Sequence, residues 1–331
     1  MRHGLLLINL GTPKNPTSAD VRRYLREFLT DKRVIDLPAP LRYLLVYCFI
    51  LPFRPQKSAR AYQAIWTQEG SPLLYHSQRL VAQLKKQVKS PDKIALGMRY
   101  SKPSIQDALN SLKDCDRISI LPLYPQYSSA ATGSSIEEAL SILASQDVIP
   151  SISVTHSFYQ HPAYVKAQAQ TINNHLNNSE HLLFSYHGVP NRQTVKSGCK
   201  QTCVGNCMDY VDINSKCYRA QCFQTSLLLA AELKLAPDKY TTAFQSRLGK
   251  ATWIKPYTVD VLADLAAKGI KKIAVVCPSF VSDCLETLEE IGIRAKLQWQ
   301  ALGGEQFTLI PSMNDDVLWL EAILEIINNG Y

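Results

Sequence analysis

Eight short apolar runs alternate with helix-like segments along the whole chain, and this alternation constrains the fold more than any other feature. Most runs are continuously apolar, which is typical of parallel strands covered by helices on both faces. We expect strands at residues 4–10, 93–98, 117–123, 151–155, 182–186, 241–244, 272–277 and 306–310. Apolar residues spaced by about 3.6 predict helices at 20–29, 77–88, 104–112, 135–143, 162–176, 224–233, 258–268, 285–291 and 316–327.

The expected strands divide into two halves of four, with a seam near residues 145–160. A chain of 331 residues, 46 % of them apolar, is long enough to bury the cores of two domains. The sequence therefore predicts an α/β fold with two doubly wound domains, residues 1–155 and 156–310, each built on a parallel four-stranded sheet. Ser104 and Ser135 are expected to cap the helices that follow them.

A row of acidic residues follows the expected strand 272–277, beyond the carboxyl end where open α/β sheets collect their ligands. In an α-helix, Asp283, Glu286 and Glu290 would lie on one face, at positions i, i+3 and i+7. Because neighbouring carboxylates repel one another, such a row adds nothing to the stability of a helix. It becomes useful beside a cation, or where protons must be carried along it.

His187 follows the expected strand 182–186 and precedes a Gly-Val-Pro turn. Histidine is the one side chain that gains and loses a proton near neutral pH without special tuning. Taken alone, His187 is best interpreted as a hydrogen-bonded loop residue. Together with the acidic row, it favours a catalytic site at the strand ends.

The charge balance and the apolar run 41–53 bear on the partners. A net charge of +8 is compatible with nucleic acid, an anionic membrane surface or an acidic ligand. We expect no nucleic acid, because the chain has no long Lys/Arg run and no aromatic–basic alternation. The run 41–53, interrupted by Arg42 and Pro52, is shorter than the roughly 20 residues that cross a bilayer. The run could equally form a peripheral membrane contact or a helix of the core.

The cysteines indicate a compartment and a second site. Because Met1-Arg2-His3 leads directly into the first expected strand, we expect no export signal and a cytoplasmic protein. Nine cysteines then do not indicate a disulfide scaffold. Five of them fall between Cys199 and Cys222, and thiols so closely spaced in a cytoplasmic protein indicate a metal centre.

Seven groups of residues resemble the ferrochelatases, the family that inserts Fe2+ into protoporphyrin IX. The resemblance runs nearly end to end, and the Ser-Tyr-His-Gly segment paired with Glu-Thr-Leu is its most specific part. It rests on Leu7-Ile8-Asn9-Leu10-Gly11-Thr12-Pro13, Arg23-Tyr24-Leu25 with Phe28-Leu29, Gly70-Ser71-Pro72-Leu73, Tyr124-Pro125-Gln126-Tyr127-Ser128, Ser185-Tyr186-His187-Gly188, Phe244-Gln245-Ser246-Arg247 and Asp283-Cys284-Leu285-Glu286-Thr287-Leu288.

The resemblance implies two Rossmann-like domains with a cleft between them, and a terminal segment, about 311–331, that returns to the N-terminal domain. It implies a lyase that makes protohaem in the last step of haem biosynthesis, with coproporphyrin III as the alternative substrate. A porphyrin carrier without catalysis and a periplasmic metal-binding protein are alternative functions from other classes. The presence of both His187 and Glu286 argues against the first, and the missing export signal against the second. Monomer and homodimer are both open.

The same resemblance assigns site residues. His187 matches the active-site histidine, as the base for pyrrole protons or as the first metal ligand. Glu286 matches the motif glutamate, with Asp283 and Glu290 on the same acidic path of the metal. Leu10 stands where other members carry Met or Tyr, and Cys284 where some carry His. The positions that match the porphyrin cleft are Leu10, Arg99, Tyr100, Tyr124, Ser128 and Trp253.

The cysteine-rich segment looks like an insertion, residues 195–222, just after the catalytic loop. Some ferrochelatases hold a [2Fe–2S] cluster, and an alternative four-thiolate site of this kind is expected here. A structural zinc site and unliganded thiols are the other readings. The candidate ligands are Cys199, Cys203, Cys207 and Cys217, with Cys222 as a substitute.

Overall fold

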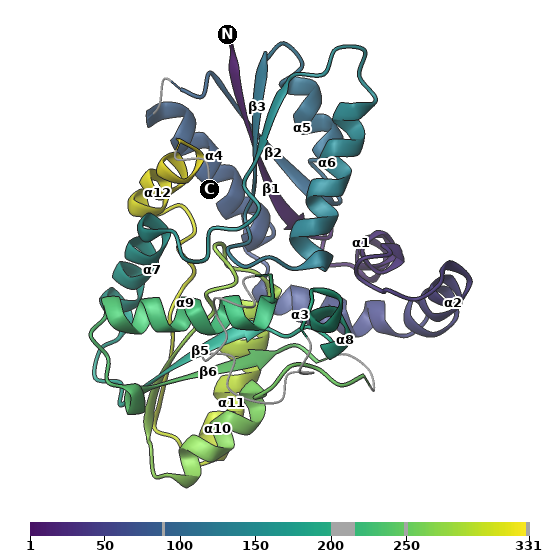
Figure 1. Cartoon of the computed structure of the whole chain (residues 1–331). Helices are drawn as coiled ribbons and strands as arrows, with labels where there is room; N and C mark the ends of the chain where they lie inside the picture. Colours follow the sequence, from purple (N-terminus) through teal and green to yellow (C-terminus); the bar gives the residue numbers. More distant parts are fainter. Residues whose placement is uncertain (88–89, 200–215, 248–250, 329–331) are drawn as a thin grey trace.

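The computed structural model describes residues 1–87, 90–199, 216–247 and 251–328 of the chain. In these residues, eight strands form two parallel sheets of four, one above the other in the view of Figure 1. Their orders, β2-β1-β3-β4 and β6-β5-β7-β8, repeat one topology. The strands are β1 His3–Gly11, β2 Lys93–Tyr100, β3 Arg117–Pro122, β4 Ser151–Val154, β5 His181–His187, β6 Tyr240–Gln245, β7 Lys272–Val276 and β8 Gln306–Leu309. The predicted fold class is confirmed, and every strand end lies within two residues of its predicted position.

Helices connect the strands and cover the sheets. In the first half they are α1 Ser18–Thr30, α2 Ala39–Leu44, η1 Leu45–Ile50, α3 Arg54–Ile65, α4 Pro72–Gln87, α5 Ile105–Ser111, η2 Ser129–Gly133 and α6 Ser134–Ala144. In the second half they are α7 Pro162–His175, α8 Asn191–Lys196, α9 Tyr218–Glu232, η4 Pro237–Lys239, α10 Thr258–Ala267, η5 Glu286–Ala295, α11 Lys296–Ala301 and α12 Val317–Asn328. Each predicted helix is present, although η5 is a π-helix rather than an α-helix.

The two predicted caps have different outcomes. Ser104 caps α5 in a capping box, in which its side chain accepts from the backbone N–H of Asp107. Ser135 does not cap α6, because the preceding π-helix η2 continues directly into α6 and buries Ser135 in its first turn. Ser128 caps η2 instead, accepting a hydrogen bond from Ala131 N at 3.2 Å.

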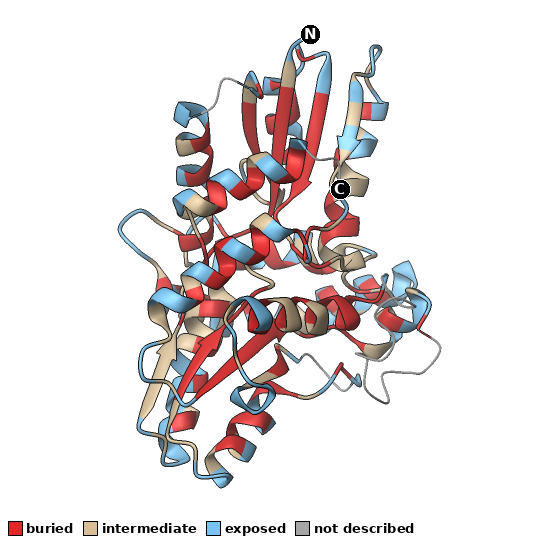
Figure 2. Cartoon of the chain, turned by 60° about the vertical axis from the view of Figure 1, so that its left-hand side comes forward, coloured by how far each residue is buried: buried red, intermediate tan, exposed pale blue. Residues whose placement is uncertain are grey.

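The central strands of both sheets carry the core, which Figure 2 colours as buried. Leu5, Leu6, Leu7 and Ile8 of β1 are fully inaccessible to solvent. Burial of each such side chain stabilises the fold by roughly 1.5–3 kcal/mol. The edge strand β8 is half-buried along its whole length, as expected of a strand with only one neighbour.

One apolar core is shared by the two halves. It contains side chains of β1, β5 and α12, including Leu7, Phe184 and Trp319. Helix α12 packs on α7 and also on α4 of the first half, and it lies beside both in Figure 1. The indole of Trp319 lies 5.7 Å, centroid to centroid, from the ring of Phe158. The terminal helix therefore packs between the two halves.

Most of the apolar run 41–53 lies in α2 and η1, at the right of Figure 1, and its last three residues connect η1 to α3. Val46 and Leu51 are buried, whereas Leu41, Phe49 and Phe53 are 55 %, 63 % and 76 % exposed. The segment therefore contributes to the core and also presents apolar side chains to solvent. No helix in the described part of the chain is long and apolar enough to cross a membrane.

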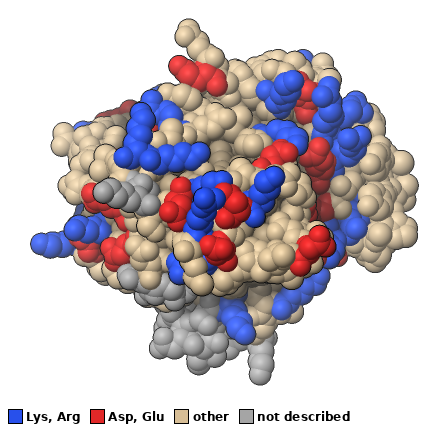
Figure 3. Space-filling model, turned by 90° about the horizontal axis from the view of Figure 1, so that it is seen from above, with Lys and Arg blue, Asp and Glu red and all other residues tan. Residues whose placement is uncertain are grey.

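Charged side chains of both signs are intermixed on the face seen from above (Figure 3). Lys and Arg lie beside Asp and Glu there, with uncharged surface between the groups. The net charge of +8 is therefore not gathered into one basic patch on this face.

Candidate active site

His187 is the last residue of β5, and a backbone contact fixes its ring. Its Nδ1 lies 2.6 Å from the carbonyl oxygen of Gly188. Because a carbonyl oxygen only accepts, Nδ1 carries the proton, and in the neutral ring Nε2 carries the lone pair. The rings of Trp253 and Phe280 lie beside it, at centroid distances of 6.4 and 6.2 Å. His187 is therefore held in the tautomer that accepts a proton at Nε2.

Gln245, at the end of β6, connects His187 to Glu286. It is the register partner of His187, and its backbone oxygen accepts from Gly188 N at 2.8 Å. Its side-chain amide donates to the backbone oxygen of Glu286 at 3.0 Å, while its Oε1 accepts from Ser185 Oγ at 2.6 Å. Sequence reasoning assigned no role to Gln245, although a polar residue at the end of a buried strand is a signal that could have found it.

The predicted α-helical row of acids is wrong in its geometry. Glu286 and Glu290 lie on η5, a π-helix with i to i+5 hydrogen bonds. Asp283 precedes that helix and lies on no face of it. Three acids in a sequence do not reveal the period of the helix that carries them, and π-helices are common at functional sites.

The Asp283 carboxylate is buried and bonded at both oxygens. Its Oδ1 accepts from Thr287 Oγ1 at 2.9 Å and from Ser312 N at 3.2 Å, and its Oδ2 accepts from Asn314 Nδ2 at 2.8 Å. Its predicted role as a metal ligand stays a prediction. These contacts fasten Asp283, three residues before the start of η5, to a segment about 30 residues further along the chain.

Glu290 faces the end of β6 rather than Glu286. It accepts from Ser246 N at 2.8 Å and from Ser246 Oγ, and its Oε2 lies 3.7 Å from an Arg294 nitrogen. It lines a pocket of about 320 Å³ together with Arg247 and Tyr257. Glu290 and Glu286 thus have different surroundings.

The Glu286 carboxylate faces α1 and α3 of the first half. Burial raises the pKa of Tyr62 well above its usual value, and the charge of Glu286 raises it further. Burial also raises the pKa of Tyr24, where Glu286 is again among the contributing charges. Burial lowers the pKa of Arg54, and Glu286 opposes that effect. Burial, followed by the Glu286 charge, raises the pKa of the Cys284 thiol, which hydrogen-bonds to this carboxylate.

Apolar side chains from both halves meet next to Glu286. Leu285 and Leu288, which flank it, pack against a cluster of the first half that contains Tyr24 and Tyr62. Leu10, at the end of β1, packs against the same cluster. The structure therefore brings the predicted porphyrin residue Leu10 close to the neighbours of Glu286. Sequence reasoning missed Tyr62, because it did not predict α3.

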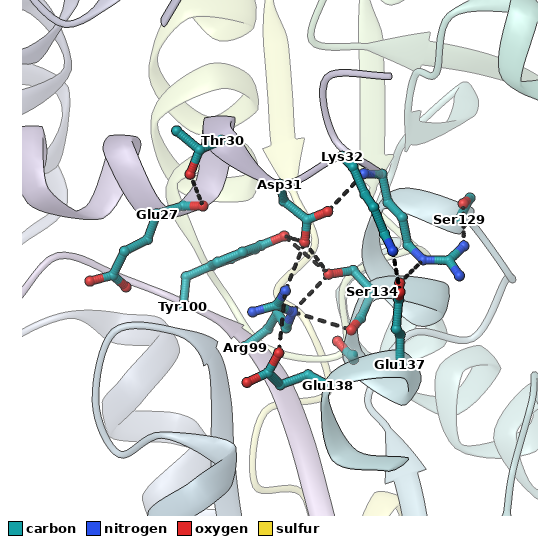
Figure 4. Close-up of polar contacts among 12 residues, drawn as sticks. Glu27, Thr30, Asp31, Lys32, Arg99, Tyr100, Ser129, Ser134, Glu137 and Glu138 are labelled. Atoms are coloured by element: carbon teal, nitrogen blue, oxygen red, sulfur yellow. Dashed lines mark hydrogen bonds and ion pairs between the residues drawn. The ribbon is translucent and has the colours of Figure 1, made fainter. Parts of the chain in front are cut away.

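Arg99 and Tyr100, at the end of β2, belong to a polar cluster around Asp31 (Figure 4). Asp31 Oδ2 accepts from Arg99 Nη2 at 2.8 Å, from Tyr100 Oη at 2.9 Å and from Ser134 Oγ at 2.5 Å. Arg33 N donates to its Oδ1 at 2.7 Å. Burial alone would raise the pKa of Asp31, but these hydrogen bonds and the Arg99 charge bring it below its usual value. The polar groups of the predicted cleft residues Arg99 and Tyr100 thus bond to the protein itself.

The other predicted porphyrin residues are spread over both halves. Trp253 is buried beside His187. Tyr124 lies with its hydroxyl 3.5 Å from Ser135 Oγ, and burial raises its pKa. The Ser128 hydroxyl caps η2. Trp253 therefore lies beside His187, and Leu10 packs against the same apolar cluster as Leu285 and Leu288, whereas Arg99, Tyr100 and Ser128 make internal polar contacts.

Comparison with known proteins identifies the family. Residues 2–331 match the model of the family described as Ferrochelatase. The ferrochelatase of Legionella pneumophila is 62 % identical over 331 residues, which cover all of both chains. The chain belongs to the ferrochelatase family. A ferrochelatase of Coxiella burnetii is 49 % identical over 330 residues, covering 98 % of this chain and 92 % of the relative.

Ferrochelatases are metal chelatases that insert ferrous iron into a porphyrin, the terminal step of haem biosynthesis, and this is the activity of the chain. Solved structures show the same fold at low identity. SirB from Bacillus subtilis with Fe3+ matches with a TM-score of 0.56 and 12 % identity, covering 100 % of this chain and 96 % of that one. The sirohydrochlorin chelatase SirB in complex with cobalt matches with a TM-score of 0.55 and 11 % identity.

The candidate cluster cysteines are only partly described. Cys203 and Cys207 lie outside the described residues, while Cys199 and Cys217 are buried at either end of that gap. Burial raises the pKa of Cys222 well above its usual value, which keeps it a thiol. In the described part of the ferrochelatase chain, no three His, Cys, Asp or Glu residues are grouped as metal ligands.

Proposed function

We propose that His187 and Glu286 divide the chemistry of metal insertion in this ferrochelatase. The reaction removes the pyrrole N–H protons and delivers a ferrous ion that has lost its water. The hydrogen bond from His187 Nδ1 to the Gly188 oxygen carries the proposal, because it leaves the Nε2 lone pair to accept a proton. The same carbonyl oxygen then stabilises the imidazolium that forms.

Glu286 receives the metal in this proposal. Carboxylate oxygens bind ferrous iron while water leaves. The neighbouring phenols of Tyr24 and Tyr62 support this role, since their raised pKa values keep them neutral beside the carboxylate. In such a partly buried setting, attraction between a carboxylate and a dication is stronger than in water. Gln245 supports the pairing by holding both residues at one strand end.

The experiment is anaerobic turnover of protoporphyrin IX with Fe2+, followed through the Soret band, with coproporphyrin III in parallel. We expect His187→Ala to abolish turnover and to leave porphyrin binding measurable. His175→Ala is the matched control, because His175 lies at the end of α7 and bonds only to Thr171 O among the described residues. Normal turnover in His187→Ala would remove the proposed base. A spectral shift that stops at one porphyrin per chain would indicate a carrier.

We also propose that the exposed apolar face of α2 and η1 contacts a membrane surface. Six large side chains support it: Leu41, Tyr43, Leu44, Tyr47, Phe49 and Phe53. Such a face lies in the headgroup region, and a neighbouring positive charge adds attraction to anionic lipid. Phe49→Ser with Phe53→Ser should abolish cosedimentation with anionic vesicles, whereas Val148→Ser, at a residue 82 % exposed elsewhere, should not. Absence of cosedimentation in the wild type would contradict the proposal.

A thiolate metal centre at the cysteine segment is a separate proposal. Two of its four candidate ligands, Cys199 and Cys217, support it by being buried at the ends of the segment. The thiolate donor set fits iron–sulfur or zinc, and Cys222, which is also buried, stays the substitute ligand in this proposal. Elemental analysis of the purified protein tests this. A protein without iron or zinc would refute it, and visible absorption would distinguish the cluster from zinc.

A further inference from the structure

The segment just before α12 connects the start of η5 to α4 of the first half. Asn314 pairs with Asp283 at two points: its Oδ1 accepts from Asp283 N at 2.8 Å, and its Nδ2 donates to Asp283 Oδ2 at 2.8 Å. Its own N–H donates to Val281 O at 2.8 Å. Asn314 has a φ of +53°, a left-handed conformation that asparagine tolerates better than most residues.

The Asp283 carboxylate is also hydrogen-bonded to η5, the helix that carries Glu286. Thr287 Oγ1 donates to Asp283 Oδ1 at 2.9 Å and accepts from Cys284 N at 3.0 Å. Ser312 N donates to the same Oδ1 at 3.2 Å. These bonds surround the first turn of η5, where Leu285 provides no side-chain cap. The orientation of Glu286 therefore depends on a buried carboxylate that precedes the helix.

The next residue, Asp315, binds three side chains of α4. Its Oδ2 accepts from Arg79 Nε at 2.7 Å and from Gln83 Nε2 at 2.8 Å, and its Oδ1 lies 3.2 Å from His76 Nδ1. The Asp315 side chain is only 14 % exposed. Burial would raise its pKa, but the hydrogen bonds from Arg79 and His76 bring it below the usual value. The charged carboxylate thus fastens the segment to α4.

Helix α4 is in turn bonded to the end of β1. Asn9 Nδ2 donates to Ser77 Oγ at 3.2 Å, and Thr12 Oγ1 donates to Ser71 Oγ, in the residue before α4, at 2.8 Å. Leu10 lies between these two contacts in the sequence. A continuous set of polar contacts therefore runs from the first turn of η5, through Asp283, Asn314 and Asp315, to the strand end that carries Leu10.

We infer that Asp283 and Asn314 are positioning residues that set the place of Glu286 relative to the first half, and that Asp283 does not bind iron. The inference rests on the proposed role of Glu286. Both oxygens of Asp283 are already used by Thr287, Ser312 and Asn314, so its carboxylate would have to break these contacts to ligate a metal. Fixing the angle of η5 is the function that its geometry performs.

Exchange of the two side chains tests this directly. In Asp283→Asn, two amide groups face each other as donors, so the contact of Asn314 Nδ2 with the side chain at 283 is lost, while Asn314 Oδ1 still accepts from the 283 backbone N–H. In the double variant Asp283→Asn with Asn314→Asp, an amide at 283 can donate to a carboxylate at 314, which still accepts from the 283 backbone N–H. Thr287 and Ser312 can still donate to the remaining oxygen at 283. The exchange therefore keeps every hydrogen bond but removes the carboxylate from position 283.

We expect Asp283→Asn to lower kcat by about tenfold or more, with the KM for Fe2+ unchanged, as for other groups that orient a ligand. The double variant should return to within about threefold of the wild type. Asn314→Gly keeps the left-handed backbone but removes the amide, and should lower kcat in the same way without a change in KM. Asn314→Gly also tests the inference if Asp283→Asn does not fold.

Opposite results overturn the inference. A double variant that folds but stays as slow as Asp283→Asn, with a raised KM for Fe2+, would make Asp283 a metal ligand. A lower Tm with an unchanged kcat in Asn314→Gly would make the contacts merely structural. Glu286→Gln in the same assay distinguishes a failure of the positioning inference from a failure of the proposed function. If Glu286→Gln turns over normally, the proposed role of Glu286 fails, whatever the Asp283/Asn314 double variant shows.

Discussion

Asp31, which follows α1 in the first half, and Glu286, which begins η5 in the second half, are two partly buried carboxylates whose partners differ. Asp31 accepts hydrogen bonds from Arg99, Tyr100, Ser134 and a backbone N–H. For Glu286, the described residues supply a hydrogen bond from the Cys284 thiol and the nearby charge of Arg54. A carboxylate whose oxygens are satisfied stabilises the fold, whereas one with weak partners can take up a cation. The halves thus repeat one topology, and under the role proposed for Glu286 they divide the tasks.

Glu286→Gln is the strongest test of the contrast between a structural Asp31 and a catalytic Glu286. We expect turnover with Fe2+ to fall by roughly 10²-fold or more, since the amide neither accepts a proton nor binds the metal comparably. The free energy of unfolding should change by less than about 1 kcal/mol, because few bonds are lost. Anaerobic turnover and urea unfolding measure the two effects. Unchanged turnover would remove the division of tasks.

Asp31→Asn is the matching change in the first half. Replacing the acceptor of three side-chain donors should cost about 1–3 kcal/mol of unfolding free energy. Turnover should fall much less than in Glu286→Gln, because Asp31 bonds to Arg99, Tyr100, Ser134 and the Arg33 backbone and not to the proposed pair His187 and Glu286. Urea unfolding of both variants side by side is the measurement. Equal stability of the two variants would contradict the comparison.

Acid unfolding tests the contribution of Asp31 to stability. The pKa of Asp31 lies below its usual value in the folded protein, so its contribution to stability is present above pH about 4 and is lost as the pH falls through the folded pKa. Asp31→Asn should therefore show a shallower loss of unfolding free energy between about pH 5 and pH 2 than the wild type. If the unfolding free energies of the variant and the wild type fall in parallel with pH, Asp31 is not responsible for the loss of stability in acid.

The smallest expected effect is at the rim of the Asp31 cluster. Lys32 pairs with Glu137, but its side chain is 64 % exposed, and Arg33 binds the same carboxylate. Exposed pairs contribute about 0–1 kcal/mol, so Lys32→Ala should hardly change unfolding or turnover. A loss as large as that of Asp31→Asn would show that the cluster acts as one unit, which a double variant would confirm.

Sequence reasoning predicted the sheets well because a buried parallel strand is visible as a continuous apolar run. It also paired His187 with Glu286, since both occur in specific motifs at strand ends. It did not predict the hydrogen bonds of Asp283 with Ser312 and Asn314, because these partners lie about 30 residues away and leave no local signal.

Two further differences have physical causes. Acid spacing alone does not distinguish a π-helix from an α-helix, so the sequence predicted the wrong form for η5. Helix α3, with Tyr62, was missed because its apolar positions pack against α1 and η5 rather than against a sheet. Residues that act through distant contacts are the ones that sequence patterns leave out.

The position of Trp319 has a consequence for how this protein folds. Its indole is completely enclosed by side chains from elements that lie far apart in the sequence, and the same continuous apolar interior holds Leu7 and Phe184. Neither half can complete that interior by itself, because the last helix supplies the piece that both need. The two lobes should consequently melt together in one cooperative transition, and a polypeptide cut at residue 155 should yield two fragments that are soluble only when they associate.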